Sequence, residues 1–345
     1  SLFSNMKWSV IIPMGRPERA GITLRSLANQ VFFPPSWEIL LVGVKAQVVA
    51  TRYAELPIVA ISLEKNELPP KTRLIGSNRA TGNWLIFVDD DMELASDYFE
   101  RLYATINSEN IKGEKIPDAI GARLPGVINN FSDRLTNISN FWSQQGSRSG
   151  SRPWLYSAAI AIRTEAYNNV GGFNPHLPNG EDIDLTQKLV QANYRLHYDP
   201  TLVAFHNHGR TTPAKMLAYF WKNGNTAIFF NQNSMVTRCF SIKTIIHHVF
   251  KDLHNNIKMN TSHIPHFTRY LPFIFINYLV FQISIEWHYQ KHLWQSSNFQ
   301  NLPFPHSGDQ KTFQAFNHFK ANCPIQGTLL YIWGLLKDLF HPIRR

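Results

Sequence analysis

Apolar runs alternate with amphipathic segments along the first part of the chain. The run WSVIIPM at residues 8–14 predicts a buried strand that ends at Pro13, and ERAGITLRSLANQ at 18–30 predicts a helix. A further helix is predicted at 71–81, and further strands are predicted at 38–44, 58–63 and 84–88. Strands that alternate with helices favour an α/β fold, with a mostly parallel sheet covered on both faces.

After residue 140, a polar, turn-rich segment interrupts the alternation of apolar and amphipathic segments. Residues 143–153 are rich in Ser, Gly and Arg and predict a surface loop, either a mobile one that closes over an anionic ligand or a plain connector. A strand is expected over 154–162 and a turn-rich segment over 171–180. An amphipathic helix is expected over 182–193.

Three aspartates, Asp89, Asp90 and Asp91, directly follow the strand at 84–88. Adjacent carboxylates repel one another unless they stay solvated or a cation neutralises them. In a parallel sheet, ligands bind beyond the carboxyl ends of the strands, where these acids fall. Oxygen ligands suit Mg²⁺ or Mn²⁺, so a metal site is one interpretation. The other interpretation is that these aspartates are solvated loop acids or cap a helix that begins in MELASDYF.

Composition narrows the class of protein. A chain of 345 residues that is 44% hydrophobic buries a substantial core, and its net charge of +10 favours anionic partners such as nucleotides, phosphates or a lipid surface. Neither a glycine-rich dinucleotide fingerprint nor a Walker motif is present. Charge alone indicates only non-specific attraction to nucleic acid, so no specific nucleic-acid partner is expected.

The two cysteines, Cys239 and Cys323, have neither zinc-site spacing nor the density of a disulfide framework. The first residues lack the charged and apolar regions of a signal peptide. A reducing compartment, and hence a cytoplasmic location, is the simpler expectation.

Four segments in this order resemble the inverting nucleotide-sugar glycosyltransferases of family 2, which have the GT-A fold: WSVIIPM, the aspartate triplet, VGGFNPHLPNGEDIDL and FHNHGRT. The resemblance covers roughly residues 7–225, expected to form the catalytic domain, and leaves 226–345 as a helical, basic, aromatic-rich region. It implies metal-dependent transfer of a sugar from a nucleoside-diphosphate sugar to a hydroxyl of a glycan, lipid-linked or other acceptor.

The resemblance also assigns roles at the acidic motif. Asp91 is the expected direct ligand of Mn²⁺ or Mg²⁺, while Asp89 contributes to the metal site and lies nearer the ribose. Asp90 is expected on the donor side. His206 matches a histidine that completes the metal site or touches the diphosphate, and His208 is its local rival. A structural histidine at a strand end is the alternative.

The acidic pair Glu181 and Asp182 matches the position of the catalytic acids in the family, with Asp182 as the expected base for the acceptor hydroxyl. Both residues also lie at the start of the helix expected over 182–193, where carboxylates are common caps. That alternative applies more to Glu181 and Asp184.

By the same resemblance, basic residues ahead of the acidic strand and after the first strand imply donor contacts. Lys71 and Arg73 are expected near the diphosphate, although both could instead lie on a solvated helix face. Arg16, after the first strand, is expected near the nucleoside, and Pro13 beside it.

One segment departs from the family. The family usually ends its second strand with an acidic pair whose aspartate reads the base, whereas this chain has LLVGVKAQ at 40–47, with Gly43, Val44 and Lys45 in that place. The identity of the donor base therefore does not follow from the resemblance. A non-catalytic protein that binds nucleotide sugars or glycans is the second hypothesis.

The C-terminal third is the more basic part, with ten Lys and Arg against four Asp and Glu over 241–345. The apolar run 271–285 is short of the roughly 20 residues that span a membrane, so a core or interfacial helix is expected. Residues 327–340 predict an amphipathic helix followed by HPIRR. This end either lies on an anionic membrane, at its inner face, or packs onto the catalytic domain or a dimer partner.

Overall fold

A computed structural model describes residues 6–107, 116–128, 130–140, 144–177, 180–210, 212–230, 242–260 and 266–295. The chain divides into two compact units. The first comprises Ser1–Pro213 and Asn256–Tyr270, and the second comprises Ala214–Asn255 and Leu271–Arg345.

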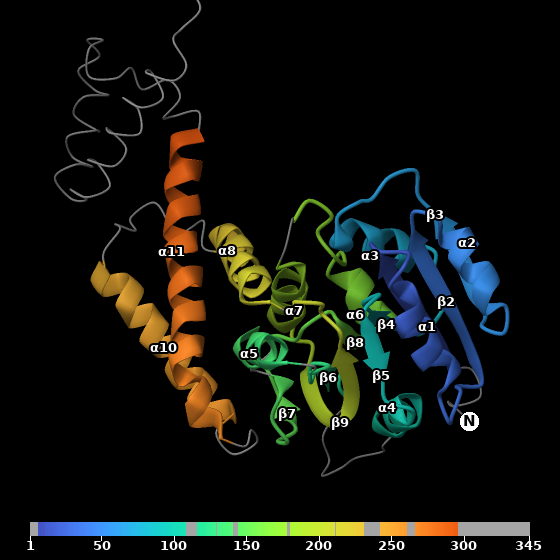
Figure 1. The fold of residues 1–345 in the computed structure, drawn as a ribbon. Coiled ribbons are helices and arrows are strands. Elements are labelled where there is room, and N and C mark those ends of the chain that lie inside the picture. Colours follow the sequence, from blue (N-terminus) through green and yellow to red (C-terminus); the bar gives the residue numbers. More distant parts are fainter. Residues whose placement is uncertain are drawn as a thin grey trace, which may run out of the picture. The chain divides into compact units, whose positions relative to one another are not determined.

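The first unit is built on a mixed sheet (Figure 1), whose strands lie in the order β3-β2-β1-β4-β8-β6-β9-β5, with β7 paired to β9. The strands are β1 (Lys7–Met14), β2 (Ser36–Gly43), β3 (Ile58–Ser62), β4 (Trp84–Val88), β5 (Met92–Leu94), β6 (Ala119–Arg123), β7 (Gly150–Ser151), β8 (Ala159–Arg163) and β9 (Leu196–His206). The first four pair in parallel, as the apolar runs predict. Antiparallel pairs involving β8, β5 and β7 make the rest mixed.

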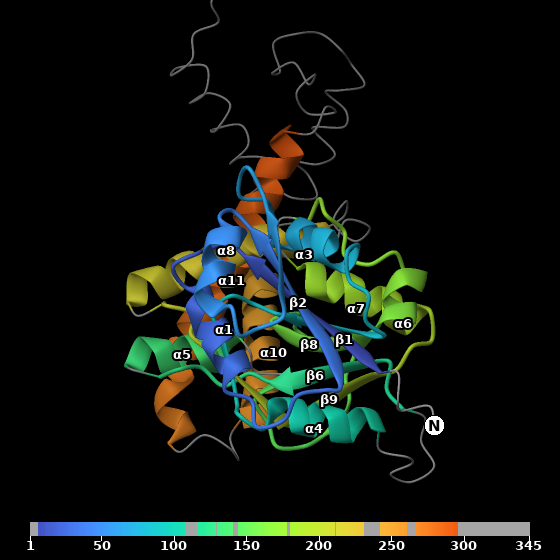
Figure 2. The same ribbon diagram turned by 90° about the vertical axis from the view of Figure 1, so that its right-hand side faces the viewer.

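Helices cover both faces of this sheet (Figure 2), and two hydrophobic clusters fill the spaces beneath them. The helices are α1 (Ala20–Ala28), α2 (Ala46–Ala50), α3 (Pro69–Ser77), α4 (Tyr98–Asn107), α5 (Phe131–Asn140), α6 (Thr164–Asn169) and α7 (Glu181–Gln191), with short 3₁₀ turns at Thr51–Tyr53 and Phe267–Tyr270. Successive side chains of a strand point to opposite faces, so Val10 joins the cluster under α1 and α4, and Ile11 joins the one under α6 and α7.

The directions of the strands bring three chain segments to one edge of the sheet. β8 runs antiparallel to both β4 and β6, and β9 runs parallel to β6. β9 therefore runs the same way as β1 and β4, and the carboxyl ends of all three lie at the same edge. His206, the last residue of β9, is thereby brought to the edge where the aspartate triplet follows β4.

Two expectations for the middle of the chain are wrong in part. Residues 143–153 were expected at the surface, but Gln144 and Gln145 are buried, because their side-chain amides donate to the carbonyls of Ala122 and Leu124 at 2.6 and 2.7 Å. These bonds satisfy backbone acceptors at the end of β6. The strand expected over 154–162 begins only at Ala159.

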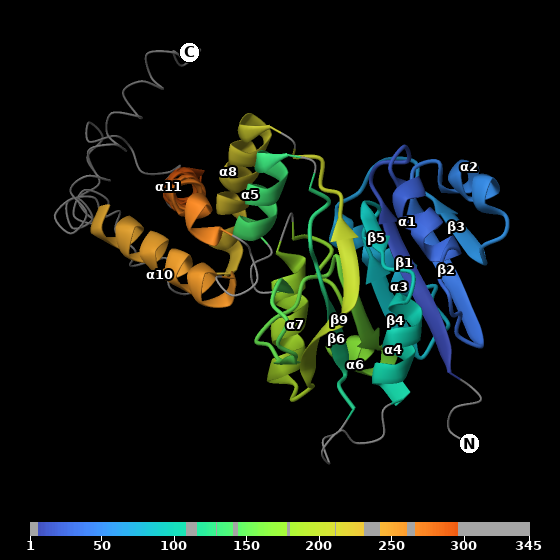
Figure 3. The same ribbon diagram turned by 60° about the horizontal axis from the view of Figure 1, so that its bottom comes forward.

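Three helices that lie side by side form the described part of the second unit (Figure 3): α8 (Pro213–Phe230) from Ala214 onward, α10 (Ile242–Asn260) up to Asn255, and α11 (Leu271–Gln295). α11 contains the apolar run 271–285. Among the described helices, none combines the length and the apolar character needed to cross a bilayer. The amphipathic segment 327–340 and both cysteines lie outside the described residues.

Gly43 allows β1 and β2 to approach closely, since a Cβ at this position would lie 2.2 Å from the Met14 carbonyl oxygen. We expect Gly43→Ala to lower the free energy of unfolding by about 1–3 kcal/mol, because the backbone must shift to accept the methyl group. Chemical denaturation followed by circular dichroism measures this change. Gly15→Ala is the matched control, because its Cβ would meet nothing closer than 3.9 Å, and an equal loss in both variants would contradict the steric argument.

Candidate active site

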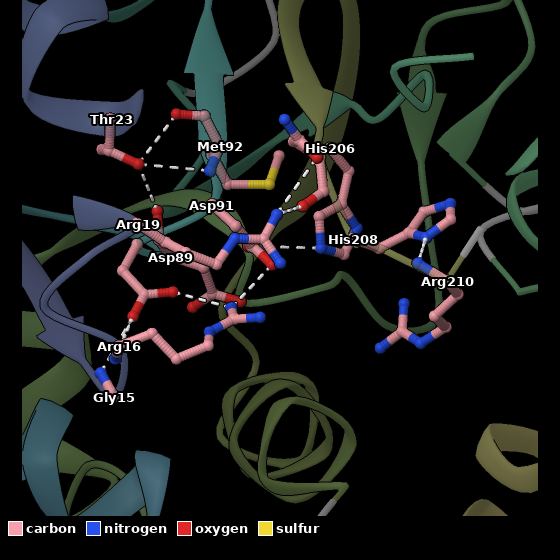
Figure 4. A network of polar contacts seen from close by, with 12 residues as sticks. Gly15, Arg16, Arg19, Thr23, Asp89, Asp91, Met92, His206, His208 and Arg210 are labelled. Atoms are coloured by element: carbon pink, nitrogen blue, oxygen red, sulfur yellow. Dashed lines mark hydrogen bonds and ion pairs between the residues drawn. The ribbon is translucent and has the colours of Figure 1, made fainter. Parts of the chain in front are cut away.

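The carboxyl ends of β1, β4 and β9 assemble a polar network around the aspartate triplet (Figure 4). Asp90 is its buried anchor. One oxygen of Asp90 accepts the backbone N–H groups of Gly15 and Arg16 at 2.9 and 2.8 Å, and the other accepts the Arg16 guanidinium at 2.8 Å. Asp90 therefore fixes the loop after β1 against the end of β4.

Asp91 links β4 to β9. Its Oδ2 lies 2.7 Å from Nη2 of Arg16, and its Oδ1 lies 3.3 Å from Nε2 of His206. The Asn207 N–H donates to the Asp91 carbonyl at 2.9 Å, so main chain and side chains hold the two strand ends together. The structure thus brings Arg16, Asp91 and His206 together at the carboxyl ends of β1, β4 and β9.

Asp89 turns away from this pair and meets Arg73 of α3. The Arg73 Nη2 lies 2.5 Å from Asp89 Oδ1, and its Nη1 lies 2.6 Å from Glu181 Oε1 at the start of α7. The Arg73 side chain is only 3% exposed and lies over the Phe173 ring, 5.4 Å from its centroid. A buried arginine therefore joins the aspartate triplet to the acidic pair.

Glu181 and Asp182 take different environments although they are neighbours. Glu181 is buried and binds Arg73, not a backbone N–H of its helix. Asp182 is half-buried, and its Oδ1 accepts the Ile183 N–H at 2.8 Å. Burial, followed by the charge of Glu181, raises the pKa of Asp182 to about 7. At neutral pH this carboxyl is poised to accept a proton.

The aspartates of the triplet also differ in pKa. Burial raises the pKa of Asp89 and of Asp90 above the ordinary value, although Arg73 and Arg16 respectively oppose it. Burial acts in the same direction on Asp91, but His206 and Arg16 outweigh it and hold the Asp91 pKa well below its usual range. Asp91 is therefore the member of the triplet that keeps its negative charge most firmly.

Side chains that the sequence did not identify brace the network. The Thr23 hydroxyl of α1 lies 2.8 Å from the carbonyl oxygens of both Asp89 and Met92. Arg19 donates to the Asn207 backbone carbonyl and, at 3.1 Å, to its side-chain oxygen. The only sequence signal was their place in the first turns after β1, which many unrelated residues share.

His208, the local rival of His206, packs edge to face against it with 5.7 Å between ring centroids. Its Nδ1 accepts the Arg210 N–H at 2.9 Å, and the ring does not reach the triplet through any ion pair. Burial, followed by the charges of His206 and Arg210, lowers the pKa of His208 to about 4. Of the two histidines, His206 is the one placed beside Asp91.

Two predicted donor residues stand apart from this network. Lys71 is exposed and pairs with Glu67 at 3.1 Å one helical turn away. Pro13 is buried in β1 opposite Val42 of β2. The helix-cap alternative for the triplet does not hold, because β5 separates Asp91 from the start of α4.

The protein side chains at this site suit a divalent cation only if a bound diphosphate supplies further ligands. Among the described residues, no three His, Cys, Asp or Glu side chains converge as a metal-binding group. Asp91 and His206 form a pair of ligand types that Mn²⁺ accepts, and Mg²⁺ or Mn²⁺ commonly takes one or two protein ligands and fills the rest with phosphate oxygens and water. The Asp91–His206 pair therefore fits a metal that arrives with a diphosphate.

The end of β2 carries the departure noted in the sequence. Lys45 is exposed and adopts a left-handed backbone conformation with φ 63°, directly before α2. A residue other than Gly pays for this conformation with strain of order 1–2 kcal/mol. No acidic side chain stands between Gly43 and Ala46.

Comparisons with known proteins agree with this architecture. Residues 9–161 match the family model described as glycosyl transferase family 2. A pre-mycofactocin glycosyltransferase of Mycobacterium tuberculosis is 44% identical over 55 residues, which cover 16% of this chain and only 12% of the relative. An uncharacterized glycosyltransferase of Haemophilus influenzae is 24% identical over 214 residues, covering 57% of this chain and 68% of the relative.

A solved structure supports the fold. The mannosyltransferase of Pyrobaculum calidifontis, in complex with GDP-Man and Mn²⁺, is 12% identical and covers 84% of this chain and 88% of its own, with a TM-score of 0.54. The predicted GT-A fold is thereby confirmed.

The ion pairs made by α3 differ in burial, which predicts different effects on stability. Arg73→Met leaves Asp89 and Glu181 without their shared cation in a buried place, so we expect a loss of about 3–5 kcal/mol in the free energy of unfolding. Lys71, whose side chain is 46% exposed and pairs with Glu67, is the matched control on the same helix, and Lys71→Met should cost no more than about 1 kcal/mol. Denaturation of both variants under identical conditions measures the difference. Equal losses would mean that burial of the Arg73 ion pairs is not what stabilises this edge.

Proposed function

We propose that this chain, whose residues 9–161 belong to glycosyl transferase family 2, transfers a sugar from a nucleoside-diphosphate sugar to an acceptor hydroxyl with inversion at the anomeric carbon. The observation that carries the proposal is the division of labour among the carboxylates. Asp91 stays charged beside His206, whereas Asp182 has a pKa near neutrality. The first suits the binding of a divalent cation that accompanies the anionic donor, and the second suits proton transfer.

Donor binding is assigned to the strand ends. Asp91 and His206 would hold Mn²⁺ or Mg²⁺ together with the diphosphate, as the Mn²⁺ in the Pyrobaculum mannosyltransferase complex supports. A bound divalent cation offsets the negative charge that builds up on the departing nucleoside diphosphate. Arg16, half-exposed at the same edge, can turn its guanidinium to a phosphate oxygen, and Asp89, held by Arg73, is assigned to the ribose side.

Asp182 is assigned the role of base. Its carboxylate takes the proton of the acceptor hydroxyl while that oxygen forms a bond to the anomeric carbon, and the bond from this carbon to the diphosphate oxygen breaks with its electron pair. Glu181 holds Arg73 and adds negative charge beside Asp182, which raises the basicity of the Asp182 carboxylate. The acceptor is a glycan, a lipid-linked molecule or another hydroxyl compound.

One observation favours the second candidate, a non-catalytic protein that binds nucleotide sugars. The end of β2 offers Lys45, not an acidic side chain, at the edge where the donor base is expected. A protein that binds without transferring would keep metal-dependent nucleotide binding but would turn over neither donor nor acceptor.

Metal-dependent nucleotide binding is the first test. We expect one of UDP, GDP, CDP and dTDP to bind in a calorimetric titration with Mn²⁺, and we expect Asp91→Asn to weaken that binding at least about tenfold, since a metal ligand is lost. Glu93→Gln is the matched control, because it removes the same charge two residues away on an exposed side chain.

Two results of this titration would contradict the proposed donor site. One is binding that is equally tight with and without Mn²⁺. The other is a loss of binding in Glu93→Gln as large as that in Asp91→Asn, which would indicate a general charge effect and not a metal ligand.

The assigned base predicts a pH profile. A base works only when deprotonated, so the transfer rate should rise with pH and level off above the Asp182 pKa of about 7. Asp182→Asn should reduce kcat at least about a hundredfold and leave the calorimetric affinity for nucleotide and Mn²⁺ unchanged. Donor turnover measured by release of nucleoside diphosphate gives both quantities. If Asp182→Asn kept the full transfer rate, another residue would have to be the base. If the native chain bound nucleotide but released no nucleoside diphosphate, the result would support the non-catalytic candidate.

A further inference from the structure

The short segment before β8 touches both groups of acids in the site. The Asp89 N–H donates to the Ala158 carbonyl at 3.0 Å, and the Ser157 N–H donates to the Asp182 carboxylate. This segment therefore contacts both the triplet and the assigned base. The side chains at 154–156 are consequently close to Asp182, since three residues of chain span at most about 11 Å.

Leu155 and Gln144 fix the segment on β6. Leu155 is buried against Gly121, where a Cβ would lie only 2.6 Å from the Leu155 Cδ2. The Tyr156 N–H donates to Gln144 Oε1 at 2.7 Å, and the Gln144 amide donates in turn to the Ala122 carbonyl at 2.6 Å. The backbone beside the assigned base is therefore held in one place before any ligand binds.

Trp154 and Tyr156 flank the buried Leu155 and are themselves partly exposed. Their rings meet edge to face, with 4.6 Å between centroids and 84° between planes. This contact fixes the two ring planes relative to each other. No Val, Ile or Leu side chain of the described stretch 144–177 is more than partly exposed, so this stretch presents aromatic, not aliphatic, surface next to the base.

We propose that Trp154 and Tyr156 form an acceptor subsite that binds a saccharide ring, so that the acceptor is a glycan or a glycoside. The inference rests on the proposed sugar transfer and names its acceptor class. One face of a sugar ring presents C–H groups that pack on an aromatic ring, while its hydroxyls stay available to polar partners such as Asp182. A polyprenyl chain would need a longer apolar path than one aromatic pair, and a small polar alcohol would need no aromatic surface.

Saturation-transfer NMR tests the subsite in the full-length chain, with Mn²⁺ and with UDP, GDP, CDP and dTDP in turn. The probes are the methyl glycosides of glucose, galactose, mannose and N-acetylglucosamine. We expect at least one glycoside to receive saturation, most strongly at the C–H protons of one ring face. The transfer should be stronger when aromatic protons of the protein are irradiated than when methyl protons are, and this comparison needs no variant.

Two substitutions of one residue separate ring stacking from simple packing. Trp154→Leu should weaken glycoside binding about tenfold, whereas Trp154→Phe, which keeps a ring, should retain it within about threefold. Phe33→Ala is the matched control, because it removes an aromatic side chain of the same unit that is 42% exposed and stacked on Trp37. Thermal melting of each variant shows whether its fold is intact.

Several results would overturn the subsite. They are no saturation of any glycoside in the native chain, equal binding by the native and Trp154→Leu chains, and an equal loss in Trp154→Phe and Trp154→Leu. Binding of farnesol in place of the glycosides, lost in Trp154→Leu, would mean that the acceptor is a lipid alcohol. Nucleotide binding and release of nucleoside diphosphate by the native chain test the proposed function separately, so failure of the subsite with these intact contradicts this inference alone.

Discussion

Repulsion among three consecutive carboxylates is the constraint around which the first unit is arranged. Two unit charges 4 Å apart interact by about 4 kcal/mol at an effective dielectric constant of 20, so the triplet needs compensating partners. The structure supplies them from distant segments: the Arg16 guanidinium from the loop after β1, the Arg73 guanidinium from α3 and the His206 imidazole from the end of β9. The strand directions that bring these ends to one edge therefore also reduce the repulsion among the three carboxylates.

The two arginines differ in how freely each can leave its carboxylate partners when a ligand binds. Arg73 is buried between Asp89 and Glu181, so moving it would strand two carboxylates in a place of low polarity. Arg16 is half-exposed, and Asp90 would keep its two backbone N–H bonds if the guanidinium left. The geometry therefore favours Arg16 over Arg73 as the arginine that changes partners when an anionic diphosphate arrives.

The parts of this site that the sequence predicts are those governed by local pattern. The apolar runs predict β1 and β4, and the rule that ligands bind at strand carboxyl ends places Asp89 to Asp91 at the right edge. The bridge from Asp89 through Arg73 to Glu181 was not predictable, because its members are far apart in sequence and an exposed helix face explained Arg73 equally well. Likewise, the polar composition of 143–153 predicted a surface loop. Two of its glutamines, Gln144 and Gln145, are nevertheless buried, because their side chains satisfy the backbone carbonyls of Ala122 and Leu124.

The buried arginine also explains why the neighbouring carboxyls of α7 diverge. Both guanidinium nitrogens that make ion pairs are committed to Asp89 and Glu181, so Arg73 reaches Asp182 only through its field. Asp182 thus experiences burial and the negative charge of Glu181 without a direct cationic partner, and two backbone N–H groups offset these only in part. A site that must hold a divalent cation needs a carboxylate that stays ionised, and Asp91 supplies it, whereas a base must be able to accept a proton. Arg73 serves the second requirement, because it holds Glu181 beside Asp182, and the charge of Glu181 raises the Asp182 pKa.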